Sequence, residues 1–197
     1  MALLVVALLL MGGCGAIGMP GAQVEIDWVD FVHLNDEQYT AMGSEVIAGP
    51  EWIGAELGEV AFNVSDNVKD SSYRTKNGDA AFRDVGTPIF EVIDSPGFVA
   101  VQDAAEVHGY RIYRAEAARD AQPVRYRDMD FADVVKVEFH EGYTQPSLRN
   151  TLTEPEEIDQ LLAFLDDSQV DSTFSPAGQE QFYTMVFYRD APLAQSI

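Results

Sequence analysis

Apolar and polar positions alternate in short runs along most of this chain, and turn residues separate the runs. The clearest example is at residues 76–92, which read KNGDAAFRDVGTPIFEV. Residues 77–79 predict a tight turn, because Asn and Gly both tolerate positive φ. Residues 80–82 then predict a short strand, residues 84–88 a second turn, and residues 89–93 a strand rich in β-branched and aromatic side chains. We therefore expect a compact β unit around which the rest of the chain is arranged.

The prediction of this β unit can be tested at two glycines and two phenylalanines. Gly78 and Gly86 each fall between apolar runs, so we expect them at turn positions that need positive φ or close backbone approach. Phe82 and Phe90 lie on the two predicted strands, and we expect both side chains to be buried in one sheet. If both were exposed on one rim, they would mark a binding surface instead.

The remainder of the first half also predicts β structure. A phase slip at Trp28-Val29 indicates a bulge or a strand buried on both faces. Residues 50–57 predict a short helix, with Pro50 at its first position and Gly58 beyond its end. Residues 65–76 are polar and predict a loop. A turn is expected at residues 35–37, and alternation predicts strands at residues 24–34, 38–42, 59–64, 98–102 and 110–113.

The second half changes character after residues 115–123, whose composition is typical of a linker. Residues 134–140 and 182–188 predict strands, and residues 142–150 predict a loop. Between them, Thr153 begins a capping box, with Glu three residues later and Pro in the first turn. Apolar residues then recur at helical spacing, at Ile158, Leu161, Leu162 and Leu165. The order strand, helix, strand is typical of a small α+β layer.

These patterns predict an α+β fold. Residues 24–118 form a mainly antiparallel β domain with a short helix, and residues 124–197 form a smaller domain with a strand-helix-strand layer. Residues 1–13 are expected to be a signal peptide, and residues 14–23 a flexible tether. The chain stops soon after its last predicted strand, which suggests that the smaller domain is truncated.

The first residues are apolar and lead to the only cysteine, Cys14. About ten consecutive apolar residues are too few for a lone transmembrane helix, but they are typical of the central region of a secretory signal. Gly12 and Gly13 precede Cys14, which resembles the bacterial lipobox, where a peptidase cuts before a cysteine that becomes diacylated. We therefore predict that diacylglyceryl Cys14, with palmitate-type chains, anchors the chain to the extracytoplasmic face of the cell membrane. The alternative is an unmodified cysteine in an ordinary signal peptide or buried helix.

The chain is strongly acidic, with 33 Asp and Glu against 12 Lys and Arg and a net charge of −21. Nucleic acids and anionic membrane surfaces are polyanions, so this charge argues against both as direct partners. Cations and basic proteins are compatible with this negative charge as partners. A hydrophobic content of 47% is enough for a packed core. A single cysteine also excludes disulfides within the chain and zinc sites built from several cysteines.

Several short segments resemble a family of uncharacterised lipoproteins of Gram-positive bacteria. Together they cover most of residues 24–114, and the pair GDAAF and GTPIFE is the most specific part. The segments are WVDFV at 28–32, NDEQY at 35–39, ELGEVAF at 56–62, GDAAF at 78–82 and GTPIFEV at 86–92. The family has no assigned activity. The resemblance therefore implies lipoprotein identity and a place in the cell envelope, but it implies no active site.

No catalytic motif stands out in the sequence. The three histidines, His33, His108 and His140, lack the His-x-x-x-His or His-x-His spacing of a zinc site. No serine sits in a Gly-x-Ser-x-Gly elbow, and no Gly-rich phosphate loop is present. Asp128 and Asp130 match only the start of a calcium loop. We therefore predict no cofactor, no metal site and no catalytic residue.

Aromatic side chains are the remaining candidates for a ligand site. Trp28, Trp52 and Tyr73 could line a groove for a sugar or peptide, although aromatic residues in strands more often belong to a core. We predict a non-enzymatic binding or spacer module, monomeric by default, whose partner is an envelope protein, peptide or glycan. The alternatives are an envelope hydrolase with paired carboxylates and a divalent-cation-dependent adhesion module.

Overall fold

The computed structural model describes residues 26–118, 129–142, 144–169, 173, 175 and 181–197. Antiparallel β structure dominates these residues, with twelve strands, two α-helices and three short 3-10 helices. Among them, no helix has the length and apolar character needed to cross a membrane. Cys14, Asp128 and most of the predicted linker lie outside the described residues. The coarse prediction of a β-rich chain with antiparallel strands is therefore confirmed.

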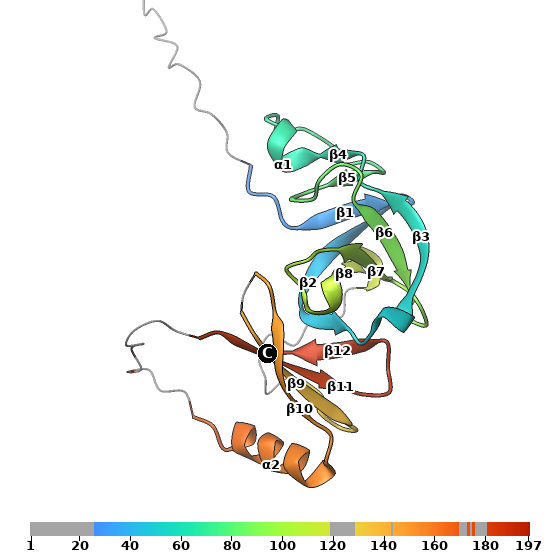
Figure 1. Cartoon of the computed structure of the whole chain (residues 1–197). Coiled ribbons are helices and arrows are strands. Elements are labelled where there is room, and N and C mark those ends of the chain that lie inside the picture. The colour runs from blue at the N-terminus through green and yellow to red at the C-terminus, as the bar shows by residue number, and fades with distance from the viewer. Residues whose placement is uncertain (1–25, 119–128, 143, 170–172, 174, 176–180) are drawn as a thin grey trace, which may run out of the picture.

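Residues 26–118 form eight strands, which make up the upper body of Figure 1 together with the one-turn helix α1. The strands are β1 (Phe31–Leu34), β2 (Glu37–Ile47), β3 (Ile53–Glu59), β4 (Phe62–Asn63), β5 (Asp79–Ala80), β6 (Pro88–Val92), β7 (Phe98–Gln102) and β8 (Tyr110–Ala115). The helices are η1 (Pro50–Trp52), α1 (Val64–Asn67), η2 (Val107–Gly109) and η3 (Glu116–Ala118).

In the second half, the described residues form four strands and one longer helix, which lies beside β9 and β10 in Figure 1. These elements are β9 (Lys136–Glu141), β10 (Ser147–Leu152), α2 (Pro155–Asp166), β11 (Tyr183–Tyr188) and β12 (Leu193–Ser196). Ile158 of α2 is buried against Val137 and Phe187 of the sheet, and the predicted leucines pack around them. The helix is therefore held by the apolar face that its sequence predicts.

One continuous sheet runs through both halves in the order β10-β9-β11-β12-β2-β8-β7-β6-β3. Strand β2 is where the halves meet, because its last residues pair with β12 in the register Leu193↔Ile47 to Gln195↔Glu45. Its first residues pair with β1 across a two-residue turn at Asn35 and Asp36. Both turn residues have positive φ, of 52° and 63°, which matches the right-handed twist of a hairpin.

An arginine fixes the loop that leads from β5 to β6. The Arg83 guanidinium donates to the hydroxyl of Tyr113 at 2.6 Å, to Asp103 at 2.6 Å and to Asp30 at 2.8 Å. The Tyr113 hydroxyl in turn donates to Asp30 at 2.8 Å. Tyr113 is fully buried in the main apolar core, so this set of four side chains ties the loop to the centre of the sheet. We call it the Arg83 cluster.

The two glycine predictions are confirmed, and one phenylalanine prediction is wrong. Gly78 and Gly86 both have φ of +88°. Phe90 is half-buried and packs against the cluster around Ile112 and Val92. Phe82 is 55% exposed. The backbone N–H of Ala81 still donates to the carbonyl of Phe31 in β1. At the next residue, Phe82, the φ of 61° turns the side chain outward.

The predicted helix at residues 50–57 is wrong beyond its first turn. The segment forms η1 and then enters β3, where pairing with β6 replaces helical hydrogen bonds. The predicted loop at residues 142–150 ends in β10, which pairs with β9. In both cases long-range pairing prevailed over a weak local preference.

Three smaller predictions also need correction. The segment before β1, which includes Trp28 and Val29, forms neither a bulged strand nor a strand buried on both faces, because residues 26–30 have no regular secondary structure. Helix α1 (Val64–Asn67) begins at the last residue of the strand predicted at residues 59–64 and continues into the predicted loop at residues 65–76, and Asn63 caps it. Thr153 is not the N-cap of α2, because Glu154 occupies that position and no side chain makes a capping hydrogen bond.

Candidate functional site

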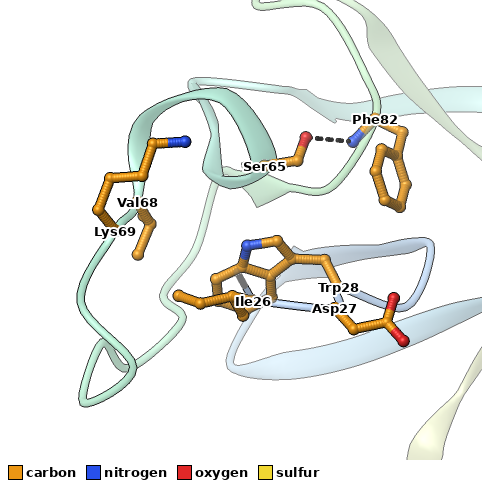
Figure 2. A pocket seen from close by; sticks show the side chains of 7 residues that line it. All are labelled: Ile26, Asp27, Trp28, Ser65, Val68, Lys69 and Phe82. Carbon is orange, nitrogen blue, oxygen red and sulfur yellow. Dashed lines mark hydrogen bonds between the residues drawn. The ribbon is translucent and has the colours of Figure 1, made fainter. Parts of the chain in front are cut away.

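A hollow of about 600 Å³ opens between the segment before β1, helix α1 and the loop that carries Phe82 (Figure 2). Its volume is in the range of small-ligand sites. Aromatic and aliphatic side chains form its walls, and three polar side chains complete the lining. The lining residues are Ile26, Asp27, Trp28, Ser65, Val68, Lys69 and Phe82. We call this site the Trp28–Phe82 hollow.

The indole of Trp28 forms one wall of the hollow. Its ring packs against Phe31 at the start of β1, with the ring centroids 6.0 Å apart. Both residues belong to a satellite apolar cluster with Val64, Val68 and Ala81. The ring is therefore held in place before any ligand arrives, which lowers the entropic cost of binding.

Helix α1 forms the opposite wall and is fixed by its own cap. The Asn63 side chain accepts hydrogen bonds from the backbone N–H of Asp66 at 3.2 Å and from the Ser65 hydroxyl at 2.8 Å. The Ser65 hydroxyl oxygen also accepts from the backbone N–H of Phe82 at 3.3 Å, as the dashed line in Figure 2 shows. This chain of bonds holds Phe82 at a defined distance from α1.

Phe82 combines two uncommon features. It is a bulky residue at positive φ, which is rare for residues other than glycine and costs of order 1 kcal/mol or more. Its ring also stays more than half exposed. The hydrogen bond from Ala81 to Phe31 on one side and the Arg83 cluster on the other hold this conformation. Strained residues held in this way are concentrated at binding sites.

The indole N–H of Trp28 is buried and has no hydrogen-bond partner within the described residues. In Figure 2 its nitrogen lies on the edge of the ring that faces α1. A buried donor without an acceptor costs roughly 1–3 kcal/mol. An acceptor brought by a ligand that reaches this edge would remove that cost.

The three predicted ligand residues do not form one site. Trp28 lines the hollow, whereas Tyr73 belongs to the same apolar cluster without lining it and donates its hydroxyl to Asp79 at 2.8 Å. Trp52 packs in a different cluster and borders a separate hollow of about 290 Å³ next to Tyr188. The prediction missed Phe82 as a site residue, because it assigned the side chain to the core.

A buried carboxylate brings together two of the three histidines. Glu138 accepts hydrogen bonds from Lys136 at 2.7 Å and from the Tyr188 hydroxyl at 2.6 Å, and His140 lies 3.0 Å away. His108 contacts the Tyr188 hydroxyl at 2.8 Å. We call this set the Glu138 cluster. No group of three His, Cys, Asp or Glu within the described residues is arranged to hold a metal ion.

The Glu138 cluster makes stability depend on pH. Burial raises the pKa of Glu138, but hydrogen bonds from Lys136, Tyr188 and His140 outweigh burial and lower this pKa to about 2. A carboxyl of lowered pKa stabilises the fold above the ordinary Glu pKa, and that contribution is lost as pH falls from about 4.5 towards 2.

We expect Glu138→Gln to remove part of the loss of stability in acid. Between pH 6 and pH 3 the wild-type free energy of unfolding should fall by roughly 2 kcal/mol more than that of the variant. Urea unfolding at both pH values measures this difference. Glu56→Gln, on an exposed part of β3, is the control and should follow the wild type. Identical pH profiles for Glu138→Gln and the wild type would contradict the assignment.

Comparison of this chain with protein-family models, with curated proteins and with solved structures found no match.

Proposed function

We propose that this chain is an envelope lipoprotein, anchored through diacylglyceryl Cys14 to the extracytoplasmic face of the cell membrane, whose body is a non-enzymatic binding module. The apolar N-terminal run and the two glycines before the cysteine support the anchor. The Trp28–Phe82 hollow supports the binding role. The β-rich domain of residues 24–118 and the small α+β domain of residues 124–197 are part of the same proposal.

The observation that carries the binding role is the exposure of apolar side chains around the hollow. Phe82 is 55% exposed, Val29 next to Trp28 is 59% exposed, and Val85 in the Phe82 loop is 65% exposed. The ion pair between Arg83 and Asp30 brings the two segments together. Exposed apolar side chains gathered around a hollow are typical of sites that bind another protein.

The ligand class follows from this lining and from charge. Ile26, Val68 and Phe82 line the hollow beside Asp27, Ser65 and Lys69, and the exposed ring of Phe82 offers a contact for an aliphatic or aromatic side chain. The net charge of −21 attracts basic partners. We therefore propose that the ligand is a basic segment of an envelope protein or peptide, which inserts one apolar side chain into the hollow.

Phe82→Ser should weaken binding of the hexapeptide Ac-KKLFKK-NH2 by about tenfold or more, because an aromatic anchor at the centre of a site commonly contributes 2 kcal/mol or more. Titration calorimetry measures the affinity. Phe164→Ser removes another exposed phenylalanine, 67% exposed against 55% for Phe82, from α2 and should leave the affinity unchanged. Equal losses in both variants would assign the binding to general hydrophobicity, and the proposal would fail.

The anchor has its own test. Cys14→Ser should release the protein from the membrane into the soluble extracytoplasmic fraction, because no acyl chain is attached. Membrane fractionation followed by immunoblotting measures the distribution. A variant that stays with the membrane would show that the apolar run is an uncleaved anchor and that Cys14 is not the attachment point.

A further inference from the structure

Asn77 and Gly78 form the only Asn-Gly pair in the chain, at the turn that precedes β5. This pair favours spontaneous deamidation, because glycine has no side chain to hinder attack by its own backbone nitrogen on the asparagine side chain. Asn77 is exposed, so solvent water reaches its carboxamide. The turn therefore holds the two groups that react and the solvent that completes the reaction.

The reaction at this pair forms a ring within the chain and releases ammonia. The backbone nitrogen of Gly78 loses its proton to solvent and forms a bond to Cγ of Asn77. The bond between Cγ and Nδ2 breaks, and Nδ2 takes up a proton from water and leaves as ammonia. A water molecule then opens the five-membered imide at one of its two carbonyls. The product at residue 77 is aspartate or isoaspartate, and no reactant other than water is needed.

The fold holds both reacting groups in hydrogen bonds. The backbone N–H of Gly78 donates to the carbonyl of His33 in β1 at 2.9 Å. The carboxamide oxygen of Asn77 accepts from the backbone N–H of Asp36 at 2.7 Å and lies 3.1 Å from Nδ1 of His33. Asn77 Nδ2 donates to the Asp36 carboxylate at 2.9 Å. Ring formation needs a free Gly78 nitrogen and a carboxamide turned towards it, so these bonds have to break first.

The residues that hold Asn77 belong to the hairpin turn between β1 and β2, far away in the sequence. Asn35 and Asp36 of this turn both have positive φ, and Asp36 meets the carboxamide with its backbone N–H and with its carboxylate. Separation of the hairpin turn from Asn77 would therefore release the carboxamide. Local openings of this kind occur in native proteins without global unfolding.

We propose that Asn77 is a deamidation site that the β1–β2 turn protects, so that only local opening of this turn leads to modification. The product cannot restore the contact. A carboxylate oxygen replaces the Nδ2 donor and lies next to the Asp36 carboxylate, so repulsion replaces a hydrogen bond. Isoaspartate also lengthens the backbone directly before Gly78, whose carbonyl accepts from the N–H groups of Ala61 and Phe62. The modification is therefore a lasting record that the turn has opened.

The test follows deamidation of the full chain during incubation at pH 7.5. Samples are digested briefly with trypsin at mildly acidic pH, and mass spectrometry measures the peptide of residues 77–83, which cleavage after Lys76 and Arg83 releases. Asp36→Ala removes the acceptor of Nδ2 and should speed deamidation of Asn77 by about fivefold or more, because one net hydrogen bond changes an opening equilibrium by about that factor. Asp36→Asn keeps a carbonyl acceptor and tolerates positive φ, so it should react like the wild type.

The wild type in urea provides a second measurement that needs no variant. The unfolded chains of the wild type and both variants should deamidate at one common rate, faster than any of the folded chains. Equal rates for the folded and unfolded wild type would show that the hydrogen bonds give no protection. Equal rates for folded Asp36→Ala and Asp36→Asn would show that the β1–β2 turn does not control the reaction. Either result would overturn the proposal.

Discussion

Arg83→Met should lower the free energy of unfolding by roughly 3 kcal/mol, because removing one partner of a buried ion pair leaves the other charges uncompensated. Asp30, Asp103 and the hydroxyl of Tyr113 each lose one donor, and Arg111, whose Nε lies 3.9 Å from Asp30 and 3.6 Å from Asp103, is the remaining cation beside the two carboxylates. Burial alone would lower the pKa of Arg83, but Tyr113, Asp30 and Asp103 together raise it above its ordinary value. The guanidinium therefore stays charged at any pH at which the protein is folded. Urea unfolding at pH 7 measures the loss.

Arg149→Met is the matched control for this prediction. Arg149 also pairs with a carboxylate, Glu141, but its side chain is mostly exposed. Exposed ion pairs contribute about 0–1 kcal/mol, so the variant should unfold almost like the wild type. Adding Asp30→Asn and Asp103→Asn to Arg83→Met should recover part of the loss by removing the unpaired charges. A loss below about 1 kcal/mol for Arg83→Met would show that the Arg83 cluster does not hold the loop.

Gly78→Val should lower the free energy of unfolding by roughly 2–4 kcal/mol, since two costs add at this position. The backbone has φ of +88°, where a β-branched residue is strained. A Cβ at Gly78 would also lie only 2.8 Å from the Cβ of Ala61, so the two chain segments would have to separate. Their backbones are joined by a hydrogen bond of 2.8 Å from the N–H of Ala61 to the carbonyl of Gly78.

Gly86 is the control that measures backbone strain without a close approach of side chains. It has the same φ of +88°, but nothing lies within 4 Å of the position its Cβ would take. Gly86→Val should therefore cost only the backbone strain, about 1–2 kcal/mol. Thermal and urea unfolding of both variants measures the difference. Equal losses would mean that the close approach to Ala61 contributes nothing to the stability of the β unit.

The parts of the fold that could be predicted from the sequence depend on neighbouring residues. Strands β6, β7 and β8 begin within one residue of their predicted positions, because alternation and flanking turns define them locally. The glycines at positive φ were predictable for the same reason. Strand β10 and the extra residues in β2 were not, because their pairing depends on β9, β8 and β12, which are distant in sequence.

The candidate site was only partly predictable. Trp28 was predicted as a ligand-binding residue because it is aromatic. The residues that line the hollow with it, Val68 and Phe82, lie about 40 and 54 residues away in the chain. Alternation assigned Phe82 to the core, whereas its positive φ reverses the direction of the side chain. The Glu138 cluster was also missed, since His108 and His140 have no sequence spacing that links them to Tyr188. Such sites depend on tertiary structure and have no local signal.

The most direct test of the binding role is the fluorescence of Trp28 itself. In a Trp52→Phe background Trp28 is the only tryptophan, since the chain contains two. Titration with Ac-KKLFKK-NH2 should shift its emission to shorter wavelength in a saturable manner, because an inserted side chain excludes water from the indole. Ac-KKSSKK-NH2, which has the same charge and no apolar side chain, should leave the emission unchanged. If Ac-KKLFKK-NH2 binds by calorimetry but does not shift the emission, or if both peptides shift it equally, the Trp28–Phe82 hollow is not the binding site.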